Sequence, residues 1–148
     1  MFPNAKGSEL LSVLATIDPA SQAAGAASTG WVPVANYFAF LAVVQTGVLG
    51  TSATVDAKLQ QALDSSGTGA KDISGKAITQ IVKATGDNKQ VLVNVKPEEL
   101  DTVNGFGFVR LTVTVGVAAS ITSAQLLGVN PRYAPADVGN QAAVVQVI

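Results

Sequence analysis

A two-residue alternation of aliphatic with other side chains is the pattern that most restricts how this chain can fold. It is clearest in Phe108–Val115, where aliphatic residues occupy every second position. Successive side chains of a β-strand point to opposite faces of a sheet, so such a segment buries one face and exposes the other. The aliphatic face of this predicted strand consists of Val109, Leu111, Val113 and Val115.

Further segments favour strands, and turn signals separate them. Tyr37–Thr46 is apolar almost throughout, which is typical of a central strand covered on both faces. The other predicted strands are Glu9–Ile17, Ala77–Val82, Gln90–Lys96 and Ser120–Leu127. The turn signals are Gly47–Gly50, Ser65–Gly69, Gly86–Asn88 and Asn104–Gly105. About six to eight short strands at this spacing predict an all-β, antiparallel β-sandwich that is jelly-roll-like and carries an extended terminal arm.

Two segments are less regular than these strands. Asp56–Leu63 is rich in helix formers, but its side chains also alternate in the manner of a strand. We favour the strand because a lone helix fits poorly between neighbours that have a period of two. Pro97–Asp101 predicts a single helical turn, because proline suits the first helical position and acidic residues suit the N-terminal end.

The predicted organisation is a sandwich domain over residues 1–128 followed by a C-terminal segment over residues 129–148. Pro131 and Pro135 prevent regular structure at the start of this segment, and Ala142–Ile148 is apolar and β-prone. One interpretation is an arm that donates a strand to a neighbour. In the other, Val144, Val145 and Ile148 finish the same sandwich. A free apolar tail is the least favoured outcome because exposed β-prone segments invite aggregation.

The low fraction of charged residues favours a protein whose surface packs against neighbouring molecules. Charged residues make up only 13% of the 148 residues, well under the roughly 25% usual for a soluble domain. The net charge is −1, and nine scattered Lys and Arg residues give no basic face for a nucleic acid. No secretory signal opens the chain, and Pro33 interrupts the apolar run Val32–Val44. We therefore expect neither a membrane nor a nucleic-acid partner, and a protein that is made and used without export.

The residue types available argue against an enzyme. The chain has no His and no Cys, which removes the Ser-His-Asp triad, the common zinc sites and the thiol nucleophile. The acidic residues are scattered, and the adjacent pair Glu98 and Glu99 lies in a predicted surface turn. The glycine pairs around Phe106 and Thr68 match no phosphate-binding motif. We expect no catalytic residue, no cofactor and no metal site.

Aromatic residues and the C-terminal segment supply the candidates for contact with a partner. Phe108 and Arg110 point away from the aliphatic face of their strand, and Phe106 shares their side. Trp31 precedes a proline and fits either a core plug or an interface anchor. Phe38 and Phe40 are expected to belong to the core. The candidate interface residues are Trp31, Phe106, Phe108, Arg110, Tyr133, Val144, Val145 and Ile148.

The segment Ala27–Ile81 resembles a type of small structural protein found in the virions of tailed bacteriophages. The shared order is a Trp-Val pair, a Tyr-x-Phe strand, a glycine turn, the strand TVDAKLQQ, a Gly/Ser loop and the sequence KDISG. Lys89–Asp101 and Gly105–Gly116 continue the same pattern. The resemblance covers roughly residues 25–128 and consists of strands and turns, without a catalytic signature.

This resemblance implies a capsid decoration or cement protein, located on the capsid surface of the virion. Its expected partners are the major capsid protein and further copies of itself in a homo-oligomer. A head–tail connector or tail structural protein is the near alternative. A β-sandwich module that binds carbohydrate or a host surface through the loops around Gly67 and Gly86 is the second alternative, although both loops lack aromatic residues.

Overall fold

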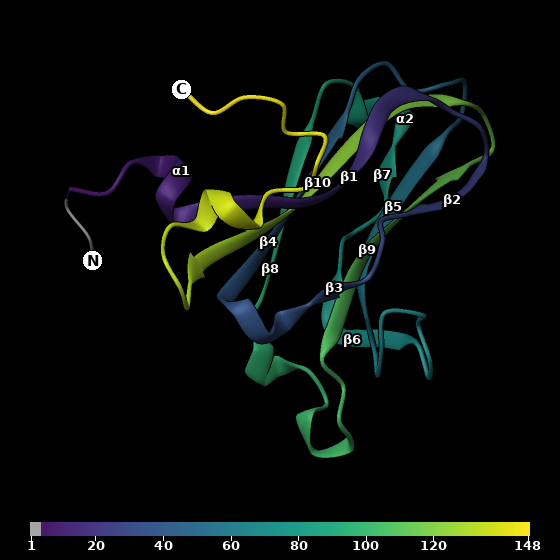
Figure 1. Cartoon of the computed structure of the whole chain (residues 1–148). Coiled ribbons are helices and arrows are strands. Elements are labelled where there is room, and N and C mark those ends of the chain that lie inside the picture. Colours follow the sequence, from purple (N-terminus) through teal and green to yellow (C-terminus); the bar gives the residue numbers. More distant parts are fainter. Residues whose placement is uncertain (1–3) are drawn as a thin grey trace.

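A computed structural model describes residues 4–148 and shows two antiparallel sheets packed face to face (Figure 1). The first sheet has the order β1 (Leu11–Gln22), β10 (Ser120–Pro131), β4 (Tyr37–Thr46), β8 (Gln90–Val95). The second has the order β2 (Gly25–Ser28), β9 (Phe108–Gly116), β5 (Thr54–Ala62), β6 (Lys71–Ala77). The short strands β3 (Val32–Pro33) and β7 (Ile81–Val82) pair with β9 and β5 respectively.

The order of the strands is that of a jelly roll. With β2 and β3 counted as one strand, and β6 and β7 as another, each sheet has four strands. Along the chain, the first sheet then contains the first, eighth, third and sixth strands, and the second contains the second, seventh, fourth and fifth. This interleaving of two Greek keys confirms the predicted antiparallel, jelly-roll-like sandwich.

The strands alternate as their sequences predict, and their inward side chains form the core. Val109, Leu111, Val113 and Val115 of β9 are at most 2% exposed. Of the segment Asp56–Leu63, all but the exposed Leu63 lies in β5, as favoured above, and Leu59 is fully buried. The predicted turn after Pro97 is present as the 3₁₀ helix η2 (Pro97–Glu99). The remaining short helices are α1 (Gly7–Leu10), α2 (Lys83–Gly86), η1 (Val34–Asn36), η3 (Thr102–Asn104) and η4 (Ala136–Gly139). None of the helices within residues 4–148 has the length and apolar character needed to cross a membrane.

Three details of the strand predictions are wrong. The predicted strand Ala77–Val82 is instead the end of β6 and the separate strand β7. β4 is central in its sheet, but its outer side chains Leu41 and Val43 are only half-buried, so its second face is not covered. Phe38 is 53% exposed and does not belong to the core; its ring instead lies against the guanidinium of Arg132.

The C-terminal segment begins as part of the sandwich and ends in solvent. β10 extends to Pro131, and η4 then packs against the end of the first sheet, where Ser12 Oγ donates to the carbonyl of the buried Ala136. The amide of Gln141 donates to the carbonyl of Val13 over 2.8 Å. Residues 142–148 form no strand, so they do not complete the sandwich.

A pair of cross-strand threonines in the first sheet allows a matched test of buried hydroxyl groups. Thr46 and Thr122 face each other across β4 and β10, and both are buried. Thr46 Oγ1 donates to the carbonyl of Gly86 over 2.6 Å and accepts from the amide of Lys89 over 3.0 Å. Thr122 Oγ1 is buried without a hydrogen-bond partner among the described residues. A buried unpaired hydroxyl destabilises a protein, whereas a paired one is costly to remove.

We predict opposite effects for the two Thr→Val substitutions. Thr122→Val should raise the free energy of unfolding by about 1 kcal/mol, because it removes an unpaired buried hydroxyl. Thr46→Val should lower it by about 1–3 kcal/mol, because it leaves the Lys89 amide without an acceptor. Urea denaturation of both variants measures the difference, and equal losses of stability would show that Thr122 has a partner after all.

Candidate interaction surfaces

The eight candidate interface residues fall into two groups in the structure. Trp31, Phe106, Phe108 and Arg110 gather around the beginning of β9, which we call the β9 surface. Tyr133, Val144, Val145 and Ile148 belong to the chain that follows β10, which we call the C-terminal surface. The two groups differ in how far their side chains are already engaged within the chain.

On the β9 surface, Trp31 is held between a strand and a loop. The guanidinium of Arg110 lies 4.5 Å from the centre of the Trp31 ring, a cation–π contact. Arg110 Nε also donates to Gln60 Oε1 over 3.0 Å. On the other side, a Cβ added to Gly67 would lie 2.5 Å from Trp31 Nε1, so the loop backbone packs tightly against the indole. The ring is therefore half-buried and offers no open platform for stacking on a sugar.

Phe106 is engaged in the same way as Trp31. It precedes β9 and lies outside the strand, with Lys71 Nζ 4.2 Å from the centre of its ring. Lys71 also pairs with Asp101, and this hydrogen bond together with one from Asn104 holds the pKa of Asp101 below its ordinary value. Phe108 faces Pro33 across the pairing of β3 with β9 and is half-buried. The cationic side chains of the β9 surface, Lys71 and Arg110, are thus already engaged in contacts within the chain.

The C-terminal surface keeps its large apolar side chains in solvent. Tyr133 is 80% exposed and Val138, in η4, is 82% exposed. Phe38 lies beside this surface. Its neighbour Tyr37 faces Pro131 across β4 and β10, and the guanidinium of Arg132 lies 4.2 Å from the centre of the Phe38 ring. The sequence interpretation missed Phe38 and Val138 as members of this surface. One sequence feature could have indicated that Val138 is exposed. It is an apolar residue in a loop that contains two prolines, where no strand is available to bury it.

The last seven residues extend this exposed surface. Gln141 is fixed at the free edge of β1, since its amide donates to Val13 and its side-chain nitrogen donates to Thr16 Oγ1 over 3.2 Å. Beyond it, Val144 is half-buried, Val145 is 93% exposed and Ile148 is fully exposed. Figure 1 shows this stretch leaving the sandwich beyond η4, in yellow. The structure therefore presents the C-terminal residues to solvent from a fixed starting point.

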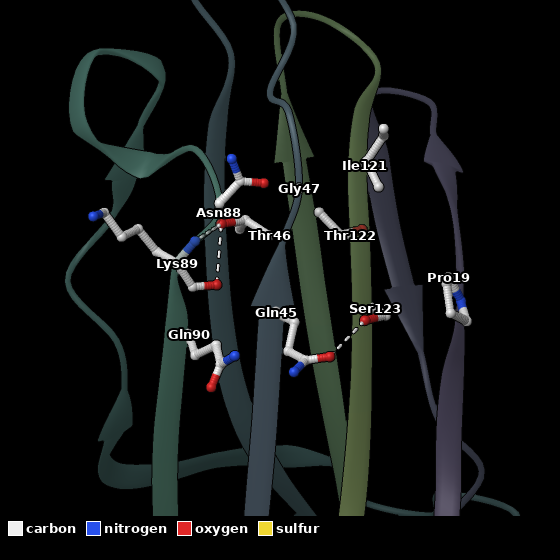
Figure 2. Close-up of a pocket in the computed structure, with 10 residues that line it drawn as sticks. All are labelled: Pro19, Gln45, Thr46, Gly47, Asn88, Lys89, Gln90, Ile121, Thr122 and Ser123. Atoms are coloured by element: carbon white, nitrogen blue, oxygen red, sulfur yellow. Dashed lines mark hydrogen bonds between the residues drawn. The ribbon is translucent and has the colours of Figure 1, made fainter.

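A shallow polar depression lies where β4 ends and β10 begins (Figure 2). Its volume is about 350 Å³, and its walls carry amide, hydroxyl and backbone groups with Lys89 as the one charged residue. Gln45 and Ser123 lie across its floor, joined by a long contact of 3.4 Å. Among residues 4–148, no three acidic, His or Cys side chains come together as a metal site. The lining of this depression contains no acid or base pair for proton transfer.

Comparisons with known proteins give distant likenesses of fold and no family. Neither a protein-family model nor a curated protein matches the chain. A prophage-derived protein, SPBc2 YomS, is 9% identical, with a TM-score of 0.44 over 79% of this chain and 91% of that one.

Two further solved structures are similar at the same level. A protein of the empty virus-like particle of Cowpea Mosaic Virus is 9% identical, with a TM-score of 0.44 over 88% of this chain and 85% of that one. A carbohydrate-binding module specific for non-crystalline cellulose is 11% identical, with a TM-score of 0.45 over 80% and 73%. Such low values carry no argument about what this chain binds. The resemblance to virion proteins of tailed bacteriophages stays a prediction.

Proposed function

We propose that this chain is a non-enzymatic structural protein of a bacteriophage virion, made in the host cytoplasm, that decorates the capsid surface. Its partners would be the major capsid protein and further copies of itself, with neither nucleic acid nor membrane among them. The proposal combines the sequence resemblance with the jelly-roll sandwich and the C-terminal surface. It assigns no catalytic residue, cofactor or metal.

The observation that carries the proposal is the exposure of apolar side chains on the C-terminal surface. Tyr133, Val138, Val145 and Ile148 are each at least 80% exposed and follow one another along the last part of the chain. Four large apolar side chains left in solvent within one stretch of chain favour a contact surface, because exposed apolar area is typical of interaction sites. A low charge, 13% of residues, also suits a surface that packs against neighbours.

The β9 surface supports the carbohydrate-binding alternative less well. Sugar recognition by stacking needs an aromatic face open to the ligand, whereas Arg110 covers Trp31 and Lys71 lies over Phe106. A connector or tail protein remains the nearer rival, because it would use the same kind of apolar contact surface. Copy number separates the two virion roles, since a coat occurs in hundreds of copies and a connector in about a dozen.

The test of the role is the copy number of this protein in purified virions, measured by quantitative mass spectrometry against the major capsid protein. We expect a simple ratio to the capsid subunit. About a dozen copies would move the protein to the connector or tail, and its absence from particles would overturn the proposal.

The part played by the C-terminal segment is tested by deleting residues 142–148. We expect the deletion to leave the thermal unfolding midpoint nearly unchanged, because Val145 and Ile148 make little contact with the sandwich. Binding to heads that lack the protein should fall by about tenfold or more, since burying one valine is worth about 1.5–3 kcal/mol. Sedimentation with purified heads measures the binding.

Two equally exposed valines provide the matched control for this experiment. Val145 is 93% exposed in the tail and Val103 is 94% exposed in η3. Val145→Asp should weaken binding to heads by about tenfold or more, because a charge would be desolvated in the contact, whereas Val103→Asp should not. Equal behaviour of the two variants would show that the tail is not the contact surface.

A further inference from the structure

We propose that β8 is an acceptor edge, to which Ala142–Ile148 of a second copy adds as an extra strand of the first sheet. This inference rests on the proposed function, because it supplies the contact by which copies of the protein would join. The partner is a second copy of this chain, the donated segment is Ala142–Ile148, and the accepting edge is β8.

The hydrogen-bond register of β8 shows which of its backbone groups are free. The amide of Thr46 donates to the carbonyl of Lys89 over 2.9 Å, so these facing residues form a hydrogen-bonded pair. Such pairs recur at every second residue of an antiparallel ladder, which directs the backbone groups of Val91, Val93 and Val95 toward β4. The amides and carbonyls of Gln90, Leu92 and Asn94 must therefore point away from the sheet. They have no hydrogen-bond partner among residues 4–148.

Nothing in the sequence of β8 protects this edge from pairing. Gln90–Val95 contains no proline, glycine or charged residue, and its pairing with β4 has no register shift. Leu92, at its middle, is 60% exposed. Natural edge strands usually carry lysine, proline or a bulge that discourages the addition of another strand. A regular, uncharged edge with an exposed leucine is suited to accept one.

The other edges of the sandwich are protected in ways that β8 is not. The free edge of β1 is occupied by its own chain through Asn140 and Gln141, which bond to the backbone of Val13. β6 carries lysines and Gly75 at a φ of +73°, and its pairing with β5 is irregular. β2 has only four residues. Among the edge strands of the two sheets within residues 4–148, β8 is the one that lacks such protection.

A groove beside β8 would receive the side chains of an incoming strand. It lies between the residues 75–79 and 91–94 and has a volume of about 530 Å³. Ile78, Val91 and Val93 supply apolar walls, and each of them is partly or fully buried against the core. A strand that bonds to Leu92 and Asn94 would place alternate side chains in this groove and the others beside Leu92.

The segment Ala142–Ile148 has the chemistry that this edge requires. Its sequence, AAVVQVI, is uncharged, rich in β-branched residues and apolar at both alternating sets of positions. The seven residues of this segment are enough to pair along all six residues of β8. The segment starts at the edge of β1, and β1 and β8 are opposite edges of the same sheet. Donation from one copy to the next is therefore head-to-tail, and successive copies would form a ring or an open chain.

Hydrogen exchange of individual amides in the full-length protein tests this contact. We expect the amides of Leu92 and Asn94 to exchange at least tenfold more slowly at concentrations where copies assemble than in dilute protein. The amides of Val91 and Val93 already bond to β4 and serve as internal controls with no such change. Sedimentation velocity at the same concentrations measures assembly.

A pair of variants at the centre of the edge adds a second measurement. Leu92→Pro removes an amide that β4 does not use and should weaken self-association at least tenfold, whereas Leu92→Thr keeps the amide and should weaken it less. Assembly with unchanged exchange at Leu92 and Asn94 would overturn the role of β8 and leave the proposed function standing. Binding of heads by a protein that stays monomeric would have the same meaning. A protein that neither self-associates nor binds heads would overturn both.

Discussion

Replacing Phe40 with alanine should lower the free energy of unfolding by about 3–5 kcal/mol, the range found for large aromatic residues in cores. Phe40 is 1% exposed, and its ring meets the ring of Tyr37 edge to face at a centroid distance of 5.8 Å. Alanine would leave a cavity at the end of the first sheet and would also lose this aromatic contact. Guanidinium denaturation with a two-state fit gives the change.

Phe38 provides the control for this substitution, because it lies in the same strand and differs mainly in burial. It is 53% exposed and touches the guanidinium of Arg132. An exposed cation–π contact is worth about 0.5–1 kcal/mol, so Phe38→Ala should cost about that much. A loss at Phe38 as large as that at Phe40 would mean that Phe38 packs in the core, as the sequence first suggested.

Gly139→Val should detach η4 from the sandwich and lower the free energy of unfolding by about 1–3 kcal/mol. A Cβ at this position would lie 3.3 Å from Ser12 Oγ and in collision with the Tyr37 hydroxyl, which itself donates to Ser12 Oγ over 2.8 Å. The valine must therefore displace η4 or break this buried hydrogen bond. Because Gln141 lies two residues after the end of η4, its amide should lose protection against hydrogen exchange as well.

Gly30→Val is the matched control for Gly139→Val. Gly30 is exposed, has no atom within 4 Å of an added Cβ, and requires no unusual backbone conformation. The change there should stay within about 0.5 kcal/mol. Equal effects at the two glycines, or an unchanged exchange rate at Gln141, would show that η4 does not fix the start of the tail.

Strict alternation made some parts of the fold predictable from sequence. The aliphatic residues of β9 and the valines of β8 occupy every second position, and a one-residue error would move them all to the wrong face. β5 was ambiguous by propensity, but its period of two outweighed its helix-forming residues. Pairing with neighbours on both sides then fixed it as a strand.

Other strands were missed because their sequences carry little hydrophobic signal. β6 reads KDISGKA and buries only Ile73 deeply, while Gly75 interrupts it in a left-handed conformation. β2 reads GAAS and has no large side chain. Such strands exist because a neighbour supplies hydrogen bonds to their backbones, and that support comes from residues far away in the sequence.

The candidate surfaces were predictable in membership but not in arrangement. The sequence singled out Trp31 and Arg110, yet their stacking depends on β3 lying beside β9. It singled out Val145 and Ile148 as a possible arm, while the anchor through Asn140 and Val13 has no sequence signature. Distances between such pairs follow from topology, and a single sequence does not reveal strand order.

The position of β10 at the centre of the first sheet has a consequence for the order in which the protein folds. β10 lies between β1 and β4, with Leu11 facing Val129, so this sheet lacks its middle until the last part of the chain has been synthesised. Pairing between strands so distant in sequence is a slow step in folding. The tail follows β10 and η4, so it acquires its fixed starting point only once the first sheet has closed. Until β10 has paired with β1 and β4, residues 142–148 thus lack a fixed position relative to the sandwich.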